Sequence, residues 1–302
     1  MSALWTLRNE GRTMTSRSLG QFFIRAYLVI FLAYMLLPLF IMGGAALNDT
    51  RFPSVYPWVG FTNRWFVDLW NDERMWGAAR NTVLVACAVV GISLPVGTAA
   101  AILINGIQAK ARSFLYGFMV APILTPGAVI GISTLLFWNK FDVPAGLHLS
   151  VMGQVSFIAA YVMLLVLARL QSFDPGLEEA ALDLGASHAQ VMRRILIPHL
   201  YPAIGAGGLI AFFQSVENFN VTLFTRGNSD TLTVYVGSKI RSGITPTINA
   251  LALILISITV IGALAYEILR RREEAKLKQV SVVEDEDEVQ SLAPRGSMLQ
   301  NK

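Results

Sequence analysis

Charged residues are scarce in this chain. Asp, Glu, Lys and Arg make up 15% of its 302 residues, whereas 54% are hydrophobic, and the mean hydropathy is +0.53. This composition excludes a large soluble domain and is typical of a polytopic membrane protein. The net charge is +4. In a membrane protein we attribute it to basic residues beside the apolar spans, which hold cytoplasmic loops on the inner side, and we expect no nucleic-acid partner.

Patterns for catalysis and metal binding are also absent from the sequence. The single cysteine, Cys87, lies in an apolar run, so it permits no internal disulfide and is expected to be an inert thiol. His148, His188 and His199 have no acidic or cysteine companions at metal-ligand spacing. No Gly-x-x-x-x-Gly-Lys-Ser/Thr sequence is present to hold the phosphates of ATP. We therefore predict no enzyme, no metal site and no cofactor of its own.

Long apolar runs dominate what is present. They predict an all-α polytopic membrane protein with six transmembrane helices, at about 22–47, 81–104, 114–138, 148–167, 199–219 and 248–269. The first run is too long for the core of a signal peptide, so we expect it to be retained as a span. Between the first two spans, segment 48–80 has three tryptophans and predicts an ordered external loop at the membrane interface.

Lys and Arg concentrate in the segments that this model places inside the cell. Arg270, Arg271 and Arg272, for example, directly follow the sixth span. The positive-inside rule then predicts that both termini are cytoplasmic. The resulting organisation is a cytoplasmic segment at 1–21, a six-span domain at 22–272 and an acidic tail at 273–302 that we expect to be disordered.

A polar segment at 174–198 separates the fourth and fifth predicted spans. Asp174 followed by Pro175 predicts a helix start, because Asp can cap free N–H groups and Pro suits the first helical position. Gly185 predicts the end of this helix, because glycine readily adopts the left-handed conformation. An ordinary loop between two spans would give the same local signals.

A second helix is predicted immediately after the glycine. Ser187 and Gln190 have the spacing of a capping box. We expect this helix to run to Pro198, where proline should end it. The segment would then consist of a helix, a glycine corner and another helix.

The order of residues across this segment is more specific than its helix signals. The pattern is Glu-Ala-Ala, three residues, Gly, nine residues, Ile, one residue, an aliphatic residue and Pro, filled by Glu179, Ala180, Ala181, Gly185, Ile195, Ile197 and Pro198. It resembles the cytoplasmic "EAA" coupling loop of the membrane subunits of bacterial ATP-binding-cassette importers. In that family the first helix of the loop docks on the ATPase subunit. The resemblance implies that Glu179, Ala180, Ala181 and Gly185 couple this chain to an ATPase.

The resemblance extends over roughly residues 80 to 265. Segment 161–169, the proline-rich third span and segment 231–234 look like the spermidine/putrescine-type permeases, specifically their second, C-type subunit. This implies a type I (MetI-like) importer fold in the bacterial inner membrane and half of a path for a small solute, with a polyamine favoured. Another small solute, such as an amino-acid derivative, an opine or an organic anion, stays open.

The resemblance also implies an assembly. A second permease subunit would lie beside this chain in the membrane lipid. Two ATPase subunits that bind ATP and Mg and a periplasmic or extracellular solute-binding protein would complete the assembly. Two other classes of function stay open at this point. A secondary carrier or channel would show internal repeats or membrane-centred charges, and a membrane enzyme or scaffold would need a catalytic group.

Four residues are candidates for lining the solute path. Pro122 and Pro126 lie in the third span, where they free backbone carbonyls. A simple kink, with Gly127 and Gly131 as a Gly-x-x-x-Gly packing face, would also explain this sequence.

The other two candidates lie near the outer end of the fifth span. Glu217 and Asn218 would face the path and favour a cationic solute, because a carboxylate at membrane depth must pair or face water. The alternative is that Glu217 is an interfacial acid paired with Arg226 or Arg241.

Overall fold

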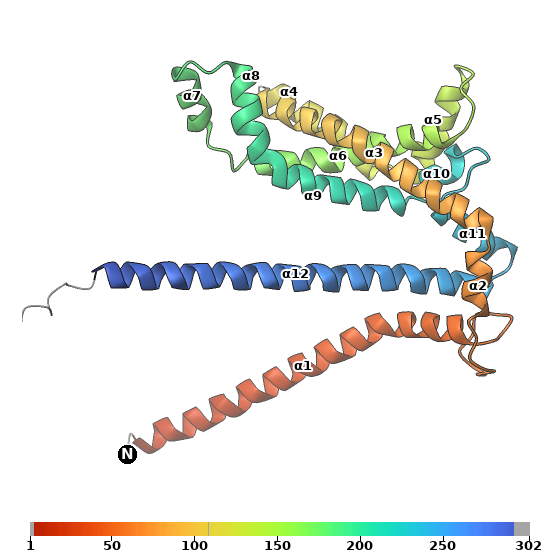
Figure 1. The fold of residues 1–302 in the computed structure, drawn as a ribbon, viewed down its shortest axis with the longest axis horizontal. Coiled ribbons are helices and arrows are strands. Elements are labelled where there is room, and N and C mark those ends of the chain that lie inside the picture. The colour runs from red at the N-terminus through yellow and green to blue at the C-terminus, as the bar shows by residue number, and fades with distance from the viewer. Residues whose placement is uncertain (1–2, 108, 293–302) are drawn as a thin grey trace, which may run out of the picture. The chain divides into compact units, whose positions relative to one another are not determined.

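The computed structural model describes residues 3–107 and 109–292. Within this part of the chain the fold is all-helical, apart from one isolated β-bridge between Asn48 and Phe61. The chain divides into two compact units (Figure 1). The terminal unit comprises residues 1–67 and 245–302, and the central unit comprises residues 68–244.

The terminal unit is built on two long helices. Helix α1 spans Ala3–Leu47, and helix α12 spans Pro246–Leu292. They pack against each other, and a small core forms where Ala46, Trp65 and Ala250 are buried. The segments Gly20–Leu47 and Pro246–Arg272 are long and apolar enough to cross a membrane, close to the predicted first and sixth spans.

The expectation of a disordered tail from residue 273 is not met in the part of the tail that the structure describes. Helix α12 continues to Leu292, and residues 293–302 lie outside the described residues. The physical reason is local, because residues 273–279 are mostly Glu, Ala, Lys, Leu and Gln, which have high helix propensity. Nothing in the sequence ends the helix at Arg272.

The loop after α1 is organised by the side chain of Asn48, which is fully buried. Its Nδ2 donates hydrogen bonds to the carbonyls of Ser54 (2.9 Å) and Pro57 (3.0 Å), and its Oδ1 accepts one from the amide of Val59 (2.8 Å). The indole of Trp65 donates to the backbone carbonyl of Asn48 at 2.9 Å. One amide side chain therefore fixes the course of the loop.

Replacing Asn48 with alanine is expected to loosen segment 49–61. The substitution removes all the side-chain bonds and leaves backbone groups unsatisfied, at about 1–3 kcal/mol for each buried group. Hydrogen–deuterium exchange of a peptide covering 48–62 should become faster. Asn48→Asp should give an effect at least as large, because a carboxylate oxygen would replace the Nδ2 donor opposite the Ser54 and Pro57 carbonyls. Unchanged exchange in the alanine variant would show that Asn48 does not hold the loop.

The core of the central unit is formed by three helices, α3 (Glu73–Gly106), α6 (Leu147–Leu170) and α9 (Ile197–Val216), which pack on one another (Figure 1). A cluster of buried aliphatic side chains, together with Met163, fills the space between them. At Gly97 the helices come so close that an added Cβ would lie 2.6 Å from the Ala159 carbonyl oxygen. Helix α3 begins earlier than the predicted residue 81, because Asp72 caps it by accepting a bond from the Met75 amide at 3.1 Å.

The predicted third span is not a simple kinked helix. It consists of α4 (Ala109–Leu124) and α5 (Gly127–Asn139), which are bent by 102° at the break. Pro126 accounts for the break, because it has no N–H to donate and disfavours helical backbone in the residue before it. Among the described residues, five helices can span a membrane, or six if this bent pair counts as one.

The remaining elements of the chain are short. They are α2 (Arg64–Trp70), α7 (Pro175–Asp183), α8 (His188–Val191), the π-helical turn η1 (Met192–Leu196), α10 (Asn220–Thr225) and α11 (Leu232–Ser242). Helix α10 packs on α5 and α6, and α11 packs on α3. Helix α7 carries the first part of the candidate site, and α10 contributes one residue, Asn220, to the second.

Candidate functional site

The first part of the site is helix α7, which begins where the sequence predicts. The Asp174 carboxylate accepts a hydrogen bond from the Gly176 amide at 2.9 Å, and Pro175 occupies the first helical turn. No residue of α7 is buried, and Glu179 and Ala180 are exposed. A nine-residue helix that buries no side chain in its own chain is available to dock on a partner.

The end of α7 is fixed by Gly185, whose φ is +84°. The Gly185 amide donates to the Leu182 carbonyl at 2.9 Å, and the Ala186 amide donates to the Ala181 carbonyl at 3.0 Å. This pair of bonds is a Schellman motif, which needs a left-handed residue at the glycine position. Gly185 therefore sets the angle at which the chain leaves α7.

The second helix also starts as predicted, with a complete capping box. The Gln190 amide donates to the Ser187 hydroxyl at 3.3 Å, and the Ser187 amide donates to the Gln190 side chain at 2.8 Å. A chain of two short helices joined by a left-handed glycine is thus built from contacts within a few residues.

The prediction that this helix ends at Pro198 is wrong. It continues through η1 into α9, so the segment from His188 to Val216 is one candidate span. Within η1 the Ile197 amide donates to the Met192 carbonyl, the wider bond of a π-helix. This turn accommodates Pro198, which cannot donate a bond and would clash with a carbonyl in a regular α-helix.

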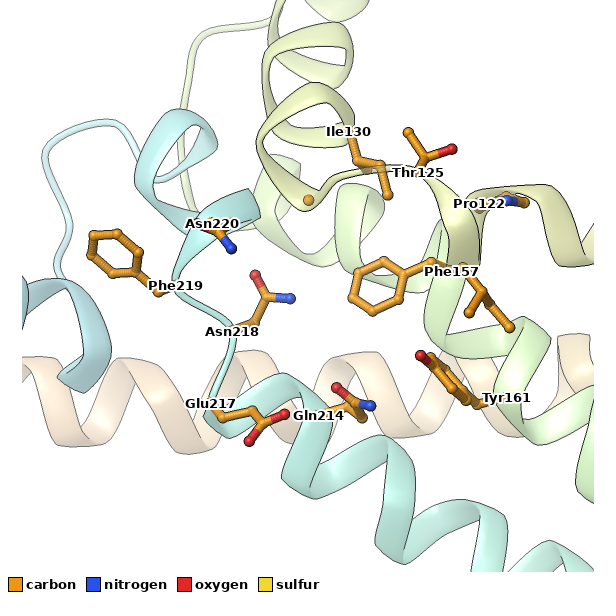
Figure 2. A pocket seen from close by; sticks show the side chains of 12 residues that line it. Pro122, Thr125, Ile130, Phe157, Tyr161, Gln214, Glu217, Asn218, Phe219 and Asn220 are labelled. Atoms are coloured by element: carbon orange, nitrogen blue, oxygen red, sulfur yellow. The ribbon is translucent and has the colours of Figure 1, made fainter.

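The second part of the site is a pocket of about 280 Å³ at the break between α9 and α10. Figure 2 shows Gln214 and Glu217 at the end of α9, with Phe157 and Tyr161 on α6 across the pocket. The remaining lining residues come from the break itself and from the α4–α5 bend, namely Pro122, Ile123, Thr125, Gly127, Ile130, Asn218, Phe219 and Asn220. Two broken helices therefore meet around one polar and aromatic cavity.

The structure places three of the four path candidates at this pocket. Pro122, Glu217 and Asn218 line it, whereas Pro126 caps α5 beside it and is not among the lining residues. Asn218 also caps α10, because its Oδ1 accepts a bond from the Val221 amide at 3.1 Å. The predicted packing face is present as well, since Gly127 and Gly131 lie against α10.

Glu217 is exposed in the isolated chain, and its carboxylate forms no ion pair with any described residue. Arg226 does not pair with it, as one interpretation of the sequence proposed, but instead pairs with Asp230. Arg74 also reaches Asp230, at 2.6 Å. Arg241, the other predicted partner, forms no ion pair with Glu217 among the described residues either, and the Glu217 side chain lines the pocket.

Helix α11 supports the break from the other side. The Thr233 hydroxyl donates to the Asn218 carbonyl at 3.3 Å. The helix is held on α3 by Asp72, which accepts a bond from the Tyr235 hydroxyl (2.8 Å) and pairs with Lys239 (3.1 Å). Partial burial opposes ionisation of Asp72, but the bonds from Tyr235 and Lys239 outweigh it and lower the pKa of Asp72. Burial, reinforced by the bond to Asp72, raises the pKa of Tyr235.

Sequence reasoning missed the aromatic wall residue Phe157 and the buried amide of Gln154. The signal for Gln154 was available, because it is a polar residue inside an apolar run.

No group of three or more His, Cys, Asp or Glu side chains capable of holding a metal occurs within the described ranges.

Known sequences resemble this chain over most of its length. The family model described as "Binding-protein-dependent transport system inner membrane component" matches residues 93–278. The spermidine/putrescine transport system permease protein PotC of Escherichia coli K12 is 27% identical over 254 residues, covering 84% of this chain and 96% of PotC. The putrescine transport system permease protein PotI of the same strain is 30% identical over 262 residues, covering 84% of this chain and 92% of PotI.

Solved structures show the same fold. A bacterial ABC transporter involved in the import of the acidic polysaccharide alginate matches with a TM-score of 0.64 and 16% identity, covering 85% of this chain and 97% of that chain. The MetNI methionine ABC transporter matches with a TM-score of 0.51 and 19% identity, covering 67% of this chain and 93% of that chain. The predicted type I importer permease fold is therefore confirmed.

Proposed function

This chain belongs to the family of binding-protein-dependent transport system inner membrane components, and on that premise we propose that it forms half of the path for a polyamine. The family is the transmembrane permease component of ABC importers and not an enzyme; ATP is bound by partner ATPase subunits. The chain is a multi-pass inner membrane protein that works with such ATPases and a solute-binding protein.

The observation that carries the polyamine proposal is the Glu217 carboxylate, which faces the pocket and is unpaired among the described residues. The amides of Gln214 and Asn218 lie beside it, and Phe157 and Tyr161 supply ring faces across the pocket (Figure 2). A carboxylate attracts an ammonium group, and aromatic faces favour cations. Relatives named as spermidine/putrescine and putrescine permeases support the same class of solute.

The fold does not select the solute, because the alginate importer that shares it acts on an acidic polysaccharide. An organic anion or a carboxylate-bearing solute such as an opine would be repelled by Glu217 and would find no arginine in the lining of the pocket. The secondary-carrier alternative is disfavoured by family membership. The remaining competitor is a neutral or zwitterionic amino-acid derivative.

The proposed coupling runs through α7. The segment Glu179–Ala181, in which no residue is buried, would dock on an ATPase subunit, and Gly185 would fix the direction of the following helix. Because α8, η1 and α9 form one continuous span, motion of α7 would be delivered directly to the helix whose far end carries Glu217. A second permease, most simply a different chain, would complete the path, which would then open alternately to each side.

A binding screen tests the solute class. The solute-binding protein that co-purifies with this chain and its ATPases should be stabilised in a thermal-shift assay by spermidine or putrescine, and the complex should then take up the same compound in proteoliposomes. Stabilisation by an amino-acid derivative or an organic anion alone would refute the polyamine proposal. A complex without an ATPase would contradict the coupling proposal.

A reporter fused directly after Arg272 is expected to be cytoplasmic. The three arginines at 270–272 follow the last candidate span, and positive charges favour the inner side. A fluorescent protein placed there should be bright, whereas alkaline phosphatase should be inactive. The matched control is the same pair of reporters inserted after Gly60, where the opposite result is expected. An active phosphatase after Arg272 would overturn the proposed orientation.

A further inference from the structure

Gln154 is a fully buried amide in the middle of the apolar helix α6. Its Nε2 donates to the Thr222 hydroxyl on α10 at 2.9 Å, and its Oε1 accepts from the Ser215 hydroxyl on α9 at 2.6 Å. One side chain therefore joins the two helices on either side of the break. A buried amide with both ends bonded to different elements fixes their separation, because losing either partner leaves a buried polar group unsatisfied.

A second pair of hydroxyls repeats this arrangement one turn earlier on α6. Ser150 and Thr225 lie 2.9 Å apart, and both are buried. The Thr225 hydroxyl donates to the Val221 carbonyl at 2.8 Å, so Ser150 is the donor between the two hydroxyls. The Gly146 amide adds a bond to the Thr225 carbonyl at 2.8 Å. Helix α10 is thus tied to α6 and its N-cap through Thr222 and Thr225.

Close backbone contacts complete the surface on which α10 packs. We call this surface the seat of α10; it includes Gly131, Ser150, Gly153 and Gln154. An added Cβ at Gly131 would lie 3.0 Å from the Val221 carbonyl oxygen, and one at Gly153 would lie 2.7 Å from a Val221 methyl. Val221 itself is fully buried. Helix α10 has only six residues, too few for an isolated helix to be stable, so its conformation depends on this seat.

The pocket wall depends on the same contacts. Asn218, Phe219 and Asn220 line the pocket (Figure 2). In the chain they lie between Ser215 and Thr222, the two residues that Gln154 holds. Gln214 and Glu217 flank Ser215 at the end of α9. The spacing between the Glu217 carboxylate and the Asn218 and Asn220 amides is therefore set by a residue that does not line the pocket.

We propose that Gln154 is a positioning residue that holds α9 and α10 at a fixed separation and so sets which solutes the pocket favours. This inference rests on the proposed function, since it takes the pocket to be part of the path. Cationic solutes of different length would be distinguished by how well their charges match this spacing.

The seat of α10 can be tested without any solute. In the full complex in nanodiscs, Cys87→Ser removes the one native thiol of this chain, and Val221→Cys places a thiol in the buried position behind α10. Introducing Gln154→Leu should raise the rate at which a small thiol reagent labels this chain by about tenfold, because opening of the seat becomes easier. Ser156→Ala is the matched control, since among the described residues its hydroxyl bonds only to the Gly153 carbonyl within α6, and it should leave the rate unchanged.

Thr222→Val is the milder second variant, for use if Gln154→Leu fails to assemble. It keeps the shape of the side chain and removes only the acceptor for Nε2. It should raise labelling in the same direction. An unchanged labelling rate in the assembled variant would overturn the inference that Gln154 holds α10.

The selectivity part is tested by uptake of spermidine and putrescine into proteoliposomes. Gln154→Leu should change the ratio of the two uptake rates by about threefold or more, since a modest change in fit shifts the two solutes unequally. Equal loss of both rates would show a structural role only and would overturn the inference. If the unsubstituted complex takes up neither polyamine, the proposed solute class fails. The role of Gln154 is then still decided by the labelling rate and by the ratio of uptake rates for two solutes that the binding protein does deliver.

Discussion

Replacing Gly185 with valine is expected to reduce solute uptake by about tenfold or more while ATP hydrolysis continues. At φ +84° a β-branched residue costs on the order of 1–3 kcal/mol, so the corner should move to another conformation. The expected loss does not come from a steric clash, because an added Cβ at Gly185 would meet no atom within 4 Å. The change would alter the angle between α7 and the span that follows it without touching the pocket.

Uptake and ATPase activity in the same proteoliposomes measure this uncoupling. Gly185→Asn should retain most of the uptake, because asparagine tolerates the left-handed conformation. Gly243→Val is the matched control for backbone strain, since Gly243 also has a positive φ (+124°) and open space but lies at the end of α11. Normal uptake in Gly185→Val would contradict the coupling proposal, and an equal loss in Gly243→Val would show that strain alone is responsible.

Glu217→Gln is expected to reduce uptake of a cationic solute by about tenfold while the complex assembles normally. The substitution keeps the size of the side chain and removes its charge, and Glu217 has no ion-pair partner among the described residues whose loss would disturb folding. The attraction between a carboxylate and a nearby ammonium in a partly hydrated pocket is enough for a change of about this size.

Glu73→Gln is the control, because Glu73 is an exposed acid of the same unit that does not line the pocket. Uptake should be unchanged in that variant. Stimulation of the ATPase by the loaded binding protein should persist in Glu217→Gln, since α7 is untouched. Undiminished uptake, or failure of the complex to assemble, would assign Glu217 a structural role and remove the main support for a cationic solute within this chain.

The sequence by itself determined the local structure of the coupling segment. The Asp174 cap, the left-handed Gly185 and the Ser187–Gln190 capping box all occur in the structure as predicted. Each involves partners only a few residues apart, so the residue types and their spacing are sufficient to specify the geometry. The apolar runs likewise specified that the chain spans a membrane, because hydropathy is a property of composition.

Helix boundaries were only partly determined by the sequence. Pro126 does break its helix, but the 102° bend could not be predicted from a proline alone. Pro198 was expected to end a helix, and instead the chain inserts the π-turn Met192–Leu196 and continues. A proline can end a helix, bend it or be accommodated within it. The outcome depends on how the neighbouring helices pack, and the residue type alone does not reveal that packing.

The tertiary structure alone decided which polar groups meet. Arg226 was a plausible partner for Glu217, yet it pairs with Asp230, which also binds the distant Arg74. Gln154 finds Ser215 and Thr222 more than sixty residues along the chain. Hydrogen bonds and close ion pairs form only between groups that lie within a few ångströms of each other, so helix packing decides which ones form, and that packing leaves the Glu217 carboxylate at the pocket.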